Sequence, residues 1–198
     1  MTPPTVIVDS EALKRAVHDI LVAVGEDPER PGLMNTPERV AELFADLYSG
    51  VGVDPVQFLV DARPVAADDH ERGELVAMRD ISFHSLCEHH LLPFEGVVSV
   101  VYAPGDRILG LGTVVSLVEL VSRRPQLQER VGEMIVHSLV SSGVASGALA
   151  VISAVHGCVA YRGPKQKLTT VTVAAQGTLA EGAPRHEALM LAGAEDWA

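Results

Sequence analysis

The segment Cys87–His90, with the sequence Cys-Glu-His-His, places two kinds of metal ligand within four residues. Cys87 and His90 are three residues apart, so one turn of backbone can direct both side chains at one ion. The only other cysteine is Cys158, which lies in the triplet His156-Gly157-Cys158. Zinc takes thiolate and imidazole ligands in tetrahedral sites, and a catalytic zinc has three protein ligands and one open position. The pattern therefore predicts a zinc site formed by Cys87, His90 and Cys158, with room for a water.

Two other interpretations of the cysteines follow from general behaviour. A cysteine most often acts as a small buried hydrophobe, and the two cysteines together could form a disulfide, although disulfides are rare inside cells. The neighbouring histidines favour the metal site over both. If His156 and Cys158 lie on one strand, residues two apart share a face, and we expect His156 beside Cys158 and over the metal.

Composition restricts the class of protein. The chain has 198 residues, of which 47% are hydrophobic and 21% charged, which is typical of a globular protein with a proper core. A net charge of −11 argues against a nucleic-acid surface. The N-terminal residues show neither a basic region nor an apolar region of a secretory signal, and no apolar run reaches membrane-spanning length. We expect a cytoplasmic protein with no nucleic-acid or membrane partner.

The hydrophobic periodicity predicts an α+β fold. The order strand, strand, helix, helix, strand, strand indicates a four-stranded antiparallel sheet with two helices on one face. The domains expected are an N-terminal helical segment over 1–72, whose part 51–72 is mostly loop, a catalytic domain over 73–180 and a tail over 181–198. The expected strands cover 75–83, 97–102, 148–161 and 168–175, and the expected helices cover 13–24, 36–48, about 113–124 and 126–141.

Three separated motifs resemble the GTP cyclohydrolase I family. They are the Cys-Glu-His-His segment, the segment Gln-Leu-Gln-Glu-Arg over 126–130, and the segment His-Gly-Cys-Val-Ala-Tyr-Arg-Gly over 156–163. The resemblance implies the tunnelling fold, in which subunits join their sheets into a ring and two rings stack, commonly as a decamer. It also implies a hydrolase acting on cyclic amidine C–N bonds, which opens the purine imidazole ring of GTP at C8, releases formate and forms a dihydroneopterin-type triphosphate.

The resemblance assigns roles at the metal end of the site. Cys87, His90 and Cys158 are implied as the ligands of Zn2+, which lowers the pKa of bound water towards ~7. His156 is implied as the acid–base partner in ring opening, since imidazole titrates near neutral pH. His89 is implied to assist proton transfer at the ribose.

Further roles concern the rest of the substrate. Glu129 fits guanine recognition, because a carboxylate can accept from N1–H and the 2-amino group, and Gln128 is implied to support it. Arg162 is the main candidate for a phosphate contact. Lys165 and Lys167 lie just beyond it.

One segment departs from the family pattern. The family usually follows its Gly-Leu step with Ser-Lys-x-x-Arg, which holds the triphosphate, whereas this chain has Gly112, Thr113 and Ser116 at those three positions. Charged hydrogen bonds contribute roughly 1.5–3 kcal/mol each, so the loss of two cations could cost about 3–6 kcal/mol. Three functions remain open: an ordinary GTP cyclohydrolase I, the same chemistry on a guanine compound without the triphosphate, and a non-catalytic ring protein that binds zinc or a pterin.

Overall fold

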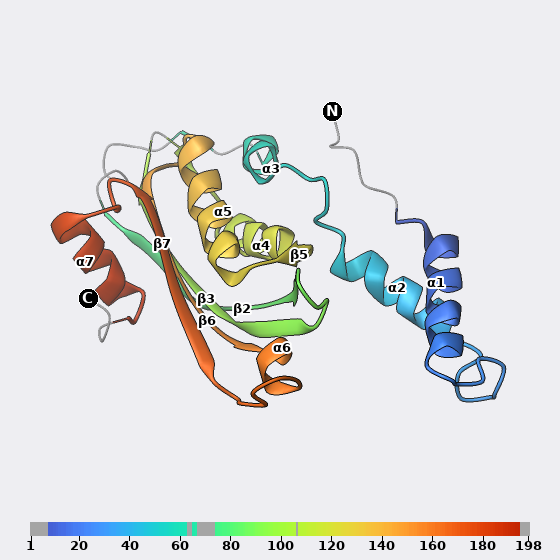
Figure 1. Ribbon diagram of the computed structural model, residues 1–198. Coiled ribbons are helices and arrows are strands. Elements are labelled where there is room, and N and C mark those ends of the chain that lie inside the picture. Colours follow the sequence, from blue (N-terminus) through green and yellow to red (C-terminus); the bar gives the residue numbers. More distant parts are fainter. Residues whose placement is uncertain (1–7, 63–64, 67–73, 106, 195–198) are drawn as a thin grey trace.

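The computed structural model describes residues 8–62, 65–66, 74–105 and 107–194, and its centre is one curled sheet (Figure 1). The sheet has five strands in the order β5-β2-β3-β6-β7. Four of them are long and antiparallel to their neighbours: β2 (Val76–Cys87), β3 (Pro93–Pro104), β6 (Ala145–His156) and β7 (Thr169–Gly177). The fifth, β5 (Pro125–Gln126), pairs in parallel with the end of β2. The expectation of four antiparallel strands is therefore corrected to a mixed sheet of five.

The strand sequences explain why the sheet is central. Nearly continuous runs of apolar, often β-branched residues suit strands that are covered on both faces, and the inner strands β3 and β6 are buried along most of their length. A bulge interrupts the pairing of β2 with β3 between Met78 and Ile81, and Asp80 within it has a positive φ of 57°. Bulges bend a strand and increase its local twist, in keeping with the curl of the sheet.

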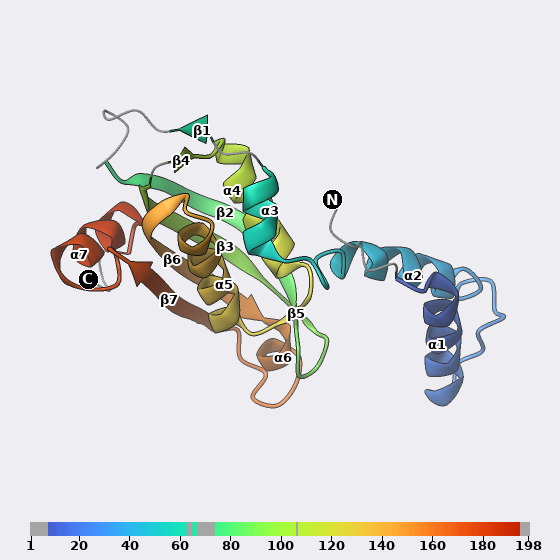
Figure 2. The same ribbon diagram turned by 90° about the horizontal axis from the view of Figure 1, so that it is seen from above.

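Helices cover both faces of the sheet. On one face lie α4 (Leu111–Ser122) and α5 (Gln128–Ser141), as the sequence predicts (Figure 2). Their apolar sides meet the sheet in the main core, whose members include Leu117, Ile135 and Ile152. On the other face, α7 (Gly182–Leu191) packs over β3 and β6 and forms a smaller core around Leu149 and Leu179.

The N-terminal helices α1 (Ser10–Ala23) and α2 (Thr36–Leu47) pack against each other as a hairpin that extends away from the sheet (Figure 1). A third helix, α3 (Pro55–Asp61), lies against α4 and α5. The expected loop over 51–72 is therefore wrong at 55–61, while much of its remainder lies outside the described residues. Asp54 caps α3 by accepting from Val56 N and Gln57 N, and Pro55 occupies its first position, where a missing N–H costs nothing.

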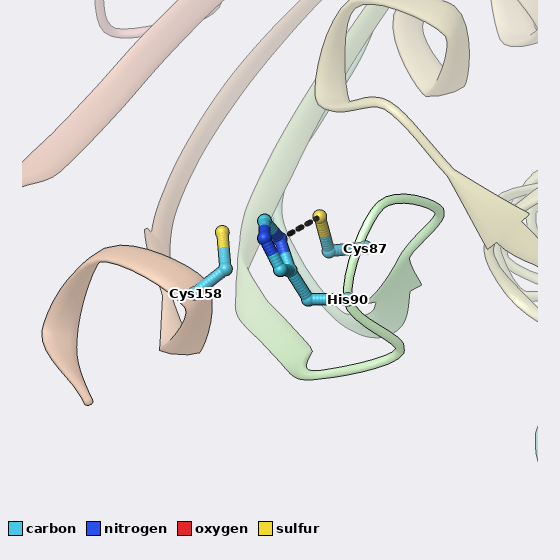
Figure 3. Close-up of side chains that lie close together, drawn as sticks. All are labelled: Cys87, His90 and Cys158. Carbon is cyan, nitrogen blue, oxygen red and sulfur yellow. Dashed lines mark hydrogen bonds between the residues drawn. The ribbon is translucent and has the colours of Figure 1, made fainter. Parts of the chain in front are cut away.

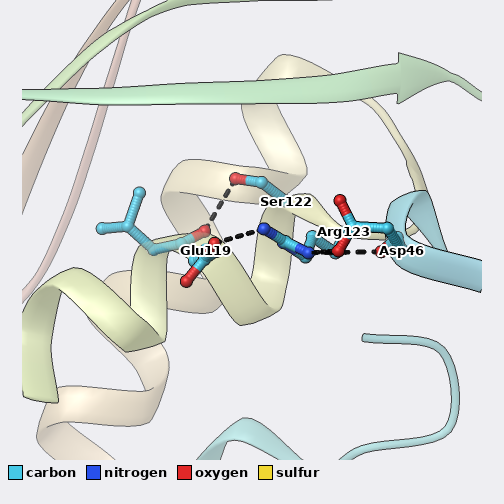
Figure 4. A network of polar contacts seen from close by, with 5 residues as sticks. Asp46, Glu119, Ser122 and Arg123 are labelled. Carbon is cyan, nitrogen blue, oxygen red and sulfur yellow. Dashed lines mark hydrogen bonds and ion pairs between the residues drawn. The ribbon is translucent and has the colours of Figure 1, made fainter. Parts of the chain in front are cut away.

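A polar network fixes the end of the hairpin to α4 (Figure 4). The Arg123 guanidinium bridges Asp46 of α2 and Glu119 of α4. The backbone adds a hydrogen bond of 2.9 Å from Gly50 N to the Arg123 carbonyl. A Cβ at Gly50 would lie 2.1 Å from the Leu120 carbonyl oxygen, so this close approach requires glycine. The last two short strands, β1 (Val65–Ala66) and β4 (Arg107–Ile108), pair with each other. In the described part of the chain, no helix combines the length and apolarity needed to cross a membrane.

Candidate metal centre and active site

The predicted metal ligands come together at one end of the sheet (Figure 3). Cys87 ends β2, His90 lies in the turn before β3, and Cys158 lies in the short helix α6 (Gly157–Ala160). Their candidate ligand atoms all lie within 4.8 Å of one another, and Cys87 Sγ is 4.0 Å from His90 Nδ1. The sequence prediction of this three-residue group is confirmed as a spatial cluster.

Backbone hydrogen bonds close the turn that carries His90. Cys87 N donates to Leu92 O at 2.9 Å, and Leu91 N donates to Cys87 O at 2.8 Å. Leu91 has a φ of +53°, in the left-handed region. Strand β5 holds the turn from the other side, because Glu88 N donates to Gln126 O at 3.1 Å.

The expectation that His156 and Cys158 share a strand is wrong. Strand β6 ends at His156, and Cys158 lies one residue into α6. A Cβ on Gly157 would lie 2.8 Å from the Pro93 carbonyl oxygen and 3.2 Å from the Tyr161 ring, so glycine lets the chain turn sharply against β3. The turn brings Cys158 to the other two ligands, and His156 is not part of that three-residue group.

His156 is held by two neighbours. Its ring stacks on Phe94, its cross-strand partner, with ring centroids 4.7 Å apart and planes 3° from parallel. Its Nε2 lies 2.7 Å from Gln128 Oε1. Partial burial lowers the pKa of His156 below its usual 6.5, and the charge of Glu129 opposes this shift. The neutral imidazole is therefore favoured near neutral pH.

The donor set suits zinc. Two sulfurs and one imidazole nitrogen match the ligand types and number of a catalytic zinc site, and both cysteines are free. Burial, followed by the neighbouring Cys87, raises the pKa of the Cys158 thiol. Because zinc binds the thiolate, a bound metal must displace a proton there, and its affinity should fall as the pH is lowered.

An open cavity of about 620 Å3 lies between α5 and β7. Glu129, Glu133 and His137 line it from successive turns of α5, opposite residues 172–176 of β7. The exposed Glu129 carboxylate is thus available to a ligand, whereas the neighbouring Gln128 is only 2% exposed. His89 is largely exposed, and its Nε2 lies 3.9 Å from the Glu88 carboxylate, which also pairs with Arg130.

The candidate phosphate contacts are less well defined. Arg162 is exposed, and its Nη1 lies 2.6 Å from His90 Nε2, beside the metal group. Lys165 is also exposed, in a turn with a positive φ of 52°. Gly112, Thr113 and Ser116 lie in the first turns of α4, and none of them carries a charge. The structure thus brings Arg162 to the metal end.

The sequence alone does not predict the contact between Phe94 and His156. The Phe94 ring is 1% exposed and supports His156. Nothing local distinguishes it from other core aromatics, but its register opposite His156 follows once β3 and β6 are paired. Cross-strand pairing is therefore the signal that finds it.

Comparisons with known proteins identify the family of the chain. The family model of GTP cyclohydrolase I matches residues 13–193. The chain belongs to the GTP cyclohydrolase I family. It is 46% identical to GTP cyclohydrolase 1 of Leifsonia xyli subsp. xyli over 93% of this chain and 96% of that protein. It is 43% identical to GTP cyclohydrolase 1 of Bacillus pumilus over 92% of this chain and 95% of that protein. It is 42% identical to GTP cyclohydrolase 1 of Bacillus subtilis over 89% of this chain and 91% of that protein.

Among solved structures, the apo form of the archaeosine synthase QueF-Like is similar over 52% of this chain and 94% of that chain, with 14% identity and a TM-score of 0.36. At that score the similarity carries no weight for fold or function. Family membership therefore rests on the sequence relationships.

Proposed function

We propose that this protein is a zinc-dependent GTP cyclohydrolase I, a hydrolase acting on cyclic amidine C–N bonds. It would open the imidazole ring of GTP at C8, release formate and lead to a dihydroneopterin-type triphosphate. The single observation that carries the proposal is the cluster of Cys87, His90 and Cys158, built beside His156 in a chain of this family.

The metal residues would hold Zn2+ through the two thiolates and the His90 imidazole. When bound, zinc supplies a Lewis acid that lowers the pKa of water towards ~7 and makes hydroxide available at neutral pH. The chain itself contributes orientation. Cys87 and His90 are set by the closed turn after β2, and Cys158 is set by the turn at Gly157.

His156 would carry the proton in ring opening. Its lowered pKa keeps the ring neutral at rest, so it can accept a proton and return it to the purine. The exposed His89 would move protons at the ribose in the later rearrangement. Glu129 would accept from N1–H and the 2-amino group of guanine at the mouth of the cavity between α5 and β7.

Arg162 and Lys165 would contact the phosphates. Both are exposed, and Arg162 lies beside the metal group, from which its guanidinium can reach an anionic ligand. A guanidinium suits phosphate because it offers paired donors in a fixed plane.

The assembly proposed is a homo-oligomeric ring with the tunnelling fold, in the form of a decamer. Two features of the structure support association. The outer edge of β7 has no strand partner in the described chain, and such an edge must be paired or blocked. The helical hairpin also exposes large apolar side chains, including Ile20, Val24 and Leu43. Light scattering at micromolar concentration should give a mass well above a dimer, and a monomer would contradict this part of the proposal.

We further propose a cytoplasmic location. Two free cysteines that serve as metal ligands need a reducing compartment.

A second function is favoured by one observation. The first turns of α4 present no cation at positions 112, 113 and 116, so a guanine compound with fewer phosphates is the alternative substrate for the same ring opening. The third candidate function is a non-catalytic protein that binds zinc or a pterin. This function would give no role to His89, Glu129 and His156.

One experiment separates the three. Purified zinc-loaded protein is offered GTP, GMP and guanosine in turn, and formate release is measured for each. Formate from GTP with a strong preference over GMP supports the first function, whereas formate from GMP or guanosine at comparable efficiency supports the second. No formate from any of them would overturn the enzymatic proposal.

A further inference from the structure

Gln128 has little freedom to meet a substrate. Its side chain is 2% exposed at the start of α5, beneath the sheet. Its Nε2 lies 3.1 Å from the Ile152 carbonyl oxygen, 3.0 Å from the Thr170 carbonyl oxygen and 3.2 Å from Thr172 Oγ1. The donors of the amide are therefore directed at β6 and β7.

These contacts fix which way the amide faces. Reversing the amide would place its oxygen against two carbonyl oxygens, which cannot donate a hydrogen bond. Oε1 must therefore face His156, whose Nε2 lies 2.7 Å away. An amide oxygen is only an acceptor, so the imidazole nitrogen at this contact must carry a hydrogen.

We propose that Gln128 is a positioning residue: its amide oxygen keeps a hydrogen on Nε2 of the His156 imidazole and so makes Nδ1 the nitrogen that exchanges a proton during ring opening. The proposal rests on the proposed function and deepens it. In a neutral imidazole the nitrogen opposite the N–H is the acceptor, and the partner of the N–H decides which nitrogen that is. Gln128 thereby acts through His156, without touching the substrate.

Phe94 supplies the second restraint. Its stacked ring limits tilting of the imidazole plane, and the Gln128 contact limits rotation within that plane. Ring opening, in which the C8–N9 bond breaks, the C8 hydroxyl loses its proton and N9 gains one, follows the addition of water. In that addition, the oxygen of water bonds to C8, the C8–N7 double bond becomes single, water loses one proton and N7 gains one. His156 would relay this proton through Nδ1 while the hydrogen on Nε2 stays with Gln128.

The kinetic test uses two substitutions of different chemistry. Gln128→Met keeps the length of the side chain but removes every hydrogen bond, whereas Gln128→Glu, protonated when buried, keeps one acceptor and one donor. We expect Gln128→Met to lower kcat roughly 10- to 100-fold, the usual effect of losing such a supporting contact, with KM almost unchanged. The kcat of Gln128→Glu should be about tenfold higher than that of Gln128→Met, because the Glu side chain can again accept a hydrogen bond from Nε2–H.

The controls separate positioning from general damage. Ser138→Ala removes another buried polar group of α5, a hydroxyl that donates to Met134 O within the same helix, and should leave kcat at the parental value. Zinc content should be the same in all variants. If Gln128 had a purely structural role, the kcat of Gln128→Glu, which buries a carboxyl group, would be no higher than that of Gln128→Met. That order, or parental kcat in Gln128→Met, would overturn the proposal.

A spectroscopic test determines the tautomer in the parent protein itself and needs a variant only to identify the signals. The zinc-loaded protein is labelled with [15N]histidine, and the His156 signals are identified by comparison with His156→Asn, at a pH where imidazole is neutral. We expect a protonated Nε2 and an unprotonated Nδ1; the opposite tautomer would overturn the proposal. Because the measurement uses resting protein, it tests Gln128 even if formate release from GTP fails.

Discussion

At the metal end of the proposed site, three candidate ligand atoms from two separate segments lie within 4.8 Å of one another, and the nearby His156 is held by Gln128 and Phe94. At the other end, the first turns of α4 present a glycine, a threonine and a serine to the surroundings. Nothing crowds the glycine, since a Cβ at Gly112 would meet no atom within 4 Å.

The difference between the two ends shows which parts of the proposed site can be substituted with little loss of stability. A substitution at the metal end disturbs side chains that contact one another and include the buried Cys87, Gln128 and Phe94. Losing a buried partner typically costs about 1–3 kcal/mol or more. A substitution at the start of α4 changes an open surface, where effects on stability are usually within ±0.5 kcal/mol. We therefore expect the residues of the proposed metal end to be more constrained by the fold than those at the start of α4.

The largest effect is expected from removing a ligand. Cys158→Ser replaces a thiolate with a hydroxyl, a poor zinc ligand at neutral pH, so both zinc and formate release should be lost. Metal analysis of the purified variant measures the first, and a formate assay measures the second. His84→Asn, which changes an exposed histidine on the neighbouring β2, should retain full zinc. Full occupancy in Cys158→Ser would remove Cys158 from the site.

Removing the proton carrier should have the next largest effect. His156→Ala is expected to keep zinc, because the metal group does not include His156. Ring opening should slow by about 10²–10⁴-fold, the usual contribution of a positioned acid or base. Single-turnover formate release measures this step directly. Parental turnover would show that another group carries the proton.

Restoring charge at the open end tests the other half of the comparison. The double substitution Thr113→Lys and Ser116→Arg should lower KM for GTP by roughly 10²–10⁴-fold, since two charged hydrogen bonds contribute about 1.5–3 kcal/mol each. Zinc content should stay the same, and KM for guanosine should hardly change. The matched variant with Gln at both positions has similar length without charge and separates packing from electrostatics. Unchanged KM for GTP would mean that other cations already hold the phosphates.

The smallest effect concerns stability and pH. The pKa of His156 is lower in the folded protein than its ordinary 6.5, chiefly because of burial. Between the folded and unfolded pKa values the unfolded chain binds more protons, so this contribution is complete above pH 6.5 and is lost as the pH falls through the folded pKa. Urea unfolding between pH 5 and 7.5 should show a shallower acid loss in His156→Asn than in the parent. If the free energy of unfolding fell equally steeply with pH in both proteins, the lowered pKa of His156 in the folded protein would be contradicted.

Several features could be predicted from residue types and spacing alone. The group of Cys87, His90 and Cys158 could be predicted because both cysteines have histidines close by in the sequence. The main strands and helices could be predicted from hydrophobic periodicity. Helix α3 was missed because its seven residues are too few for a periodic signal, although Asp54 and Pro55 do mark its start. Strand β5 has only two residues.

Other features depend on contacts that no local pattern contains. The sharp turn at Gly157 is set by the Pro93 carbonyl, which belongs to another strand. The orientation of Gln128 is set by acceptors on β6 and β7. Sequence motifs therefore located these residues, but their tasks became visible only once the sheet was assembled.

Leu91 belongs both to the turn that carries His90 and to the groove at the helical hairpin. A left-handed backbone conformation costs a non-glycine residue about 1–2 kcal/mol, and Leu91 adopts it directly after His90. Glycine would remove that cost, but it would also remove the side chain that, together with Leu13 and Tyr48, lines the groove of about 560 Å3 at the helical hairpin. The same residue thus belongs to the turn that carries a proposed metal ligand and to the wall of the hairpin groove, so we expect a substitution at Leu91 to affect both.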